Sequence, residues 1–141
     1  MSRLRTPACE LFGTQYPIVQ TGMGWVAGAR LTAATSSAGG LGILASATMT
    51  MDELTTAVHA VKERTDRPFG VNLRSDQADV DERIALIVRE GVRVASFAQA
   101  PGERLVKTLK DQGVVVMPTI GAPRRRSSSM ARRPEESSVA R

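Results

Sequence analysis

The chain has 141 residues, a length that predicts one folded domain and not more than one. Of these residues, 42% are hydrophobic and 23% charged, which is typical of a globular domain. The single cysteine excludes an internal disulfide, and no stretch reaches the roughly 20 apolar residues of a membrane helix. The net charge of +5 lies mostly in residues 122–141, with six arginines and two glutamates, so it indicates no nucleic-acid surface on the folded part. Without a signal-peptide pattern, we expect a cytoplasmic protein that binds neither membrane nor nucleic acid.

Short apolar runs alternate with segments of helical spacing along residues 1–121. The runs predict strands, because strands covered on both faces read as continuous apolar stretches; they occupy residues 17–20, 41–45, 69–73, 92–97 and 114–120. The intervening segments predict helices at residues 29–38, 51–65, 80–90 and 102–112. Thr50 and Glu53 have the spacing of a capping box at the start of the second helix.

Five strands and four helices in regular alternation predict an α/β fold with a parallel sheet. Periodicity alone does not separate a partial (β/α) barrel from an open doubly wound sheet, because both repeat this unit. Residues 122–141 have no apolar period and are rich in arginine and serine, so we expect a disordered basic tail.

Polar or glycine residues at the predicted strand ends are the candidates for chemistry. Gly22, Met23 and Gly24 follow the first strand, where glycines let the backbone approach a flat ligand, although an ordinary turn would use them equally well. Asn72 interrupts an apolar strand and needs a hydrogen-bond partner, either a ligand or a backbone group. Gln20, Ser96 and Thr119 hold similar positions.

Other reactive residues are better explained by structure. His59 is the single histidine and lies on a predicted helix, away from any strand end, so we expect it at the surface. Cys9 has no histidine nearby in sequence and is expected to be a small buried residue. Trp25 either packs over the mouth of the fold or anchors its loop. No metal-ligand spacing and no catalytic residue stands out.

Four segments together resemble the nitronate monooxygenase family in order and spacing over residues 4–121. Residues 16–26 read YPIVQTGMGWV and look like the first-strand motif of that family. Residues 38–42 (AGGLG), 67–73 (RPFGVNL) and 114–121 (VVVMPTIG) are similar to its second, third and fifth strands. Each segment alone is only suggestive, whereas the set is specific.

The resemblance implies the front part of a TIM barrel with non-covalent FMN. It implies that Gly22, Met23 and Gly24 contact the flavin and that Asn72 hydrogen-bonds it. The family oxidises alkyl nitronates with O2, which gives the expected activity and substrates. The family's histidine and phosphate loops belong to later strands, which have no counterpart in these residues, and His59 does not replace that histidine.

Residues 1–121 are therefore expected to be an incomplete FMN-binding barrel. We interpret residues 122–141 as a tail read out of frame in a truncated family member, in which the activity is in doubt. Two alternatives stay open. One is an FMN-dependent enoyl-ACP reductase of similar fold, which would use NAD(P)H. The other is a non-catalytic half-barrel that self-associates through its exposed edge strands.

Overall fold

The structure is a computed structural model, and it describes residues 4–120. A five-stranded parallel sheet runs in the order β1-β2-β3-β4-β5. The strands are β1 (Val19–Gln20), β2 (Leu41–Ala45), β3 (Phe69–Leu73), β4 (Val94–Phe97) and β5 (Val115–Pro118). The parallel sheet predicted from the apolar runs is confirmed, and its strand order follows the chain, as consecutive βα units in a barrel require. The structure is thus a half-barrel.

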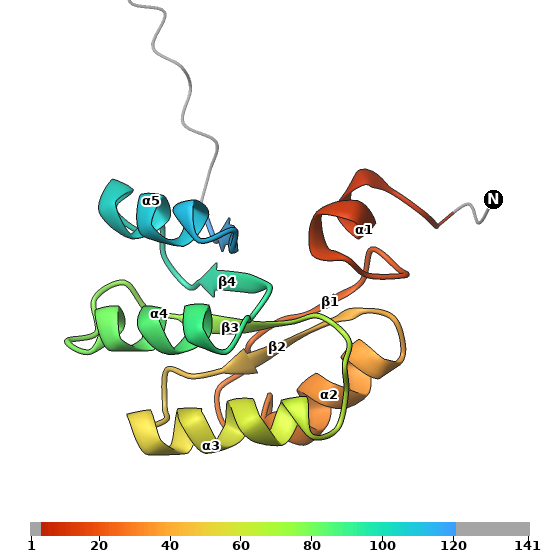
Figure 1. The fold of residues 1–141 in the computed structure, drawn as a ribbon, viewed down its shortest axis with the longest axis horizontal. Coiled ribbons are helices and arrows are strands. Elements are labelled where there is room, and N and C mark those ends of the chain that lie inside the picture. The colour runs from red at the N-terminus through yellow and green to blue at the C-terminus, as the bar shows by residue number, and fades with distance from the viewer. Residues whose placement is uncertain (1–3, 121–141) are drawn as a thin grey trace, which may run out of the picture.

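Four helices follow the strands at the predicted places: α2 (Ala29–Ser37), α3 (Met51–Lys62), α4 (Val80–Arg89) and α5 (Glu103–Asp111). They cover the outer face of the sheet (Figure 1), where a continuous apolar core includes Leu44, Val71 and Phe97. The capping box at α3 is confirmed, because Thr50 Oγ1 accepts from Glu53 N and Glu53 Oε2 accepts from Thr50 N.

A fifth helix, α1 (Pro7–Phe12), was not expected from the sequence. It lies apart from the other helices (Figure 1), and its Phe12 packs on Leu41, Ile43 and Val94. These three residues belong to the inner face of the sheet, so α1 covers the inner face near the strand starts. The predicted tail, residues 122–141, lies outside the described residues.

The AGGLG segment is explained by close packing of α2 against β2. Gly39 ends the helix with a φ of 94°, a conformation that favours glycine. A Cβ on Gly42 would lie 2.1 Å from the carbonyl oxygen of Thr32 in α2. Only glycine at position 42 therefore lets the helix backbone approach the strand this closely.

Within residues 4–120, none of the helices has the length and apolar character needed to cross a bilayer.

Candidate functional site

A row of four residues crosses the inner face of the sheet near the carboxyl ends of the strands. Ala45 pairs with Asn72, Asn72 with Ser96, and Ser96 with Met117. Paired residues of adjacent parallel strands share a face, and Ile43 and Val94, two positions earlier in their strands, belong to the inner core. The row therefore lies one layer above that core. This end of a (β/α) barrel carries the active site in characterised enzymes.

Gly22 lies directly against Asn72. A Cβ built on Gly22 would be 2.5 Å from Asn72 Cβ, too short for a real contact, and 3.0 Å from Asn72 Cγ, tighter than most real contacts. The loop after β1 therefore passes over β3 at a distance that only glycine permits. The structure brings together two residues predicted to share a site, 50 positions apart in the sequence.

Asn72 has a side-chain partner on the neighbouring strand. Its Nδ2 donates to Ser96 Oγ at 2.8 Å, so the predicted need for a partner is met in part by a hydroxyl rather than by backbone. Its Oδ1 accepts no hydrogen bond from any residue of the described range 4–120. The Asn72 backbone carbonyl accepts from Ser46 Oγ at 2.6 Å, which ties β3 to the loop after β2. One amide oxygen thus stays available at the mouth.

Met23 and Gly24 continue the loop with different constraints. Met23 is 40% exposed, and its carbonyl accepts from the N–H groups of Val26 and Ala27 at 3.1 and 2.8 Å. A Cβ on Gly24 would lie 3.7 Å from Thr48 Cγ2, an ordinary contact. Packing against the described residues therefore requires a glycine at position 22 but not at position 24.

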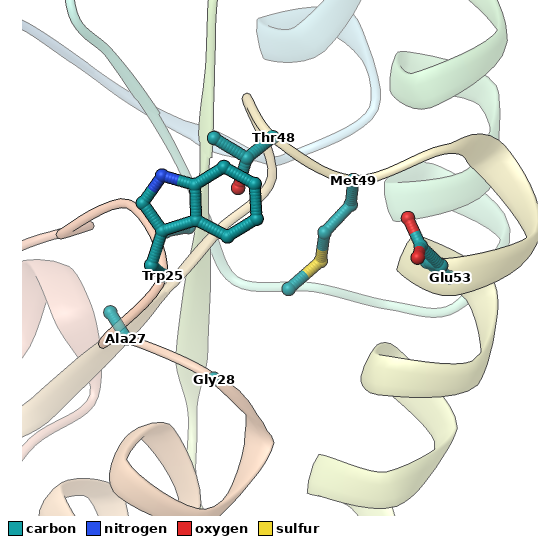
Figure 2. A pocket seen from close by; sticks show the side chains of 7 residues that line it. Trp25, Ala27, Gly28, Thr48, Met49 and Glu53 are labelled. Carbon is teal, nitrogen blue, oxygen red and sulfur yellow. The ribbon is translucent and has the colours of Figure 1, made fainter.

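A cavity of about 320 Å³ opens beside this loop, between it and the loop that joins β2 to α3. Figure 2 shows the Trp25 indole and the Met49 side chain flanking it. The lining residues are Trp25, Ala27, Gly28, Ala45, Thr48, Met49 and Glu53. Ala45 also belongs to the row that contains Asn72, so the cavity adjoins the predicted cofactor contacts.

The β2–α3 loop is held by a buried arginine that sequence reasoning missed. Arg83 of α4 is 2% exposed; its Nη1 donates to Ser46 O at 2.8 Å and its Nη2 to Met49 O at 2.6 Å. Nη2 also donates to Asp79 Oδ2 at 2.8 Å, and this hydrogen bond lowers the pKa of Asp79. The one sequence signal was an arginine four residues after an aspartate.

The remaining candidates lie away from this row. Gln20 Nε2 donates to the backbone oxygens of Ile43 and Thr21, which is the structural role left open for it. Thr119 is exposed after β5. His59 lies at the surface of α3, with Nε2 3.4 Å from Glu90 Oε1, and Cys9 is buried, as predicted.

Comparison with known proteins decides the family. The nitronate monooxygenase family profile matches residues 5–83, which is more than half of the chain. The chain belongs to the nitronate monooxygenase family. This confirms the resemblance, and the relatives below are oxidoreductases by name.

Two curated relatives share more than 60% identity with this family member. The (3aS,4S,5R,7aS)-5-hydroxy-7a-methyl-1-oxo-octahydro-1H-indene-4-carboxyl-CoA dehydrogenase of Mycobacterium tuberculosis is 65% identical over 120 residues, covering 85% of this chain and 34% of the relative. The Rhodococcus jostii protein of the same name is 62% identical and covers 86% and 35%. The nitronate monooxygenase of Pseudomonas aeruginosa is 37% identical and covers 68% and 28%. The chain thus spans about a third of the length of the relatives it matches.

Solved structures agree with the half-barrel. FabK from Thermotoga maritima superposes with a TM-score of 0.78 at 34% identity, covering 82% of this chain and 37% of that one. The nitroalkane oxidase of Streptomyces ansochromogenes gives 0.71 at 26% identity, covering 82% and 42%. The partial barrel, left open against a doubly wound sheet by periodicity alone, is therefore confirmed.

Proposed function

We propose that this family member supplies one wall of an FMN site in an oxidoreductase that dehydrogenates a bicyclic acyl-CoA thioester. The observation that carries the proposal is the 62–65% identity with two relatives named for that dehydrogenation, against 37% with the Pseudomonas nitronate monooxygenase. This substrate replaces the alkyl nitronate as the favoured one. Nitronate oxidation with O2 remains the second candidate, because the family and that relative carry its name.

The described residues fit one edge of a flat cofactor. The backbone at Gly22 leaves no side chain between the loop and the inner row, because a Cβ there would meet Asn72. Asn72 Oδ1 is free to accept from a ring N–H, and Asn72 Nδ2 is fixed by Ser96. Met23, half-exposed at the same loop, would lie against a ring face. We propose Gly22, Met23, Gly24 and Asn72 as the FMN contacts.

The chemistry divides simply between cofactor and protein. When bound, FMN supplies a two-electron acceptor that takes a hydride from the substrate carbon. The residues of the described chain orient the ring: Asn72 by an amide hydrogen bond, and Gly22 by close backbone approach. The hydrogen bond from Asn72 Nδ2 to Ser96 Oγ fixes the Asn72 rotamer, and fixed partners cost little reorganisation during the reaction.

The test is an FMN titration of the full chain followed by anaerobic mixing with candidate substrates. We expect quenching of flavin fluorescence on binding, and bleaching of flavin absorbance with a bicyclic hydroxyacyl-CoA thioester. Bleaching with an alkyl nitronate alone would favour the second candidate. Bleaching with NAD(P)H alone would favour the alternative of an FMN-dependent enoyl-ACP reductase. An unchanged flavin spectrum and fluorescence would contradict the cofactor assignment.

A further inference from the structure

Trp25 is held in a backbone conformation that its side chain disfavours. Its φ is 63°, and it is the one non-glycine residue with positive φ within residues 4–120. A bulky side chain in the left-handed region is an outlier, and such outliers cluster at ligand-binding positions. The indole is also 89% exposed, so packing inside the described range does not compensate for the strain. The strain therefore needs another explanation than burial.

The strained residue forms one wall of the 320 Å³ cavity. Figure 2 places the indole beside Thr48 and across the cavity from Met49, with Ala27 and Gly28 along another side. Trp25, with its φ of 63°, directly follows Gly24, where an added Cβ would lie 3.7 Å from Thr48 Cγ2 in the β2–α3 loop. The loop conformation thus sets the width of the opening.

The cavity wall formed by the β2–α3 loop is held in place by side-chain hydrogen bonds. Arg83 donates to the carbonyl oxygens of Ser46 and Met49, and Gln77 Nε2 donates to Ala47 O at 3.3 Å. These bonds fix the backbone on both sides of Thr48. A cavity with one wall clamped by a buried arginine and the other held under strain is largely pre-formed, as small-molecule sites usually are.

The lining selects an apolar group. Ala27, Ala45, Met49 and the indole present carbon or sulfur surface. The one charged lining residue, Glu53, already accepts from Thr50 N at 2.8 Å as part of the helix cap. No lysine or arginine lines the cavity within the described part of the chain, so a phosphate or carboxylate would find no counter-charge there. Its volume is at the lower end for small-molecule sites, which fits one part of a larger substrate.

We propose that this cavity is a subsite for the compact, saturated ring system of the substrate, with Trp25 as its specificity-determining residue. The assignment rests on the proposed function, because it places the ring system next to the FMN contacts through Ala45 and Asn72. The thioester portion of the substrate would extend out of the mouth. The indole would lie against the rings, covering apolar surface that water otherwise contacts.

Trp25 is the single tryptophan of the chain, so tryptophan fluorescence reports on this residue alone. Saturated octahydroindene carboxylate is titrated into the full chain while tryptophan emission and its quenching by acrylamide are followed. Burial of the indole should shift emission to the blue and reduce quenching severalfold. Succinate, an acid without rings, should change neither. Absence of a shift with the bicyclic acid would overturn the proposal.

Two variants separate the subsite from the rest of the loop. Thr48→Glu adds a charge at the exposed lining position and should abolish the emission shift, whereas Val26→Glu adds the same charge beside Trp25 but outside the cavity and should leave it intact. Equal responses of the two variants would contradict the assignment. Trp25→Gly relieves the strain, so its urea midpoint should stay equal or rise while equilibrium dialysis shows at least tenfold weaker binding of the acid. Unweakened binding to Trp25→Gly would also overturn it.

FMN binding is measured separately on the same protein without the bicyclic acid. A flavin that binds with no emission shift would refute the subsite and leave the proposed function standing. An emission shift without flavin binding would support an apolar ring site and refute the cofactor assignment.

Discussion

Gly22, in the loop after β1, lies directly against Asn72 in the inner row of the sheet. The 2.5 Å from a built Cβ to Asn72 Cβ shows that a glycine at 22 is a packing requirement and not only a turn preference. The same approach brings the loop backbone against the side-chain amide of Asn72. One contact therefore links the first-strand motif to the third-strand motif.

Gly22→Ala should destabilise the chain. The added methyl would overlap the Asn72 side chain, and overpacking of this kind costs about 1–3 kcal/mol. Displacement of Asn72 should also weaken FMN binding. Urea unfolding and flavin titration measure the two effects. Gly24→Ala is the matched control, because its Cβ would make an ordinary 3.7 Å contact; an equal loss in both variants would contradict the packing argument.

Arg83→Met should destabilise the chain by about 2 kcal/mol, because it leaves the Met49 carbonyl without its donor and removes one of the two donors to the Ser46 carbonyl, which keeps the Met49 N–H. The β2–α3 loop should also become more mobile, which hydrogen exchange at Thr48 and Met49 would report. Arg104→Met is the control: Arg104 also pairs with an aspartate, but it is 68% exposed and should cost less than about 1 kcal/mol. Similar losses of stability in both variants would contradict the role of Arg83 in holding the β2–α3 loop.

The difference between these two arginines shows where sequence reasoning stops. Continuous apolar runs located all five strands, because strands buried on both faces have few polar positions. Arg83 resembled a solvated helix residue, since the carbonyl groups it binds lie 37 and 34 residues earlier in the chain. No residue near Arg83 in the sequence indicates these partners. The strain at Trp25 was likewise invisible, because a tryptophan after a glycine has no fixed φ until the loop is built.

Helix α1 was missed for a related reason. It has six residues, too few for an apolar period, although Pro7 at its start and Gly13 at its end are local signals of a short helix. Its place is set by Phe12 packing on β2 and β4, which only the folded sheet provides. That Asn72 and Gly22 share one site could be predicted through the resemblance, whereas their direct contact and the role of Ser96 as the partner of Asn72 needed the folded loop and the register of β3 and β4.

Stability should fall below pH 4.5 through Glu90. Hydrogen bonds from Lys62 first, and from Arg89 and His59, lower the pKa of Glu90 from 4.5 to about 2, against the cost of burial. Because the folded pKa is the lower one, this contribution is present above pH 4.5 and is lost as the pH falls to about 2. Urea midpoints of the wild-type chain and Glu90→Gln should converge across that window. Parallel curves would show that Glu90 is not responsible.

The outer strands of the sheet predict self-association. β1 and β5 each have one neighbour within residues 4–120, and the β1 edge exposes Ile18 (60%) and Val19 (37%). An unpaired apolar edge is a template for another strand, so we expect the full chain to sediment as more than a monomer at high concentration. Val19→Lys should shift it toward the monomer, because a charged edge resists strand addition. Val26→Lys, in an exposed loop away from the edge, should not. A wild-type chain that sediments as a monomer at every concentration, or equal effects of the two variants, would refute association through this edge.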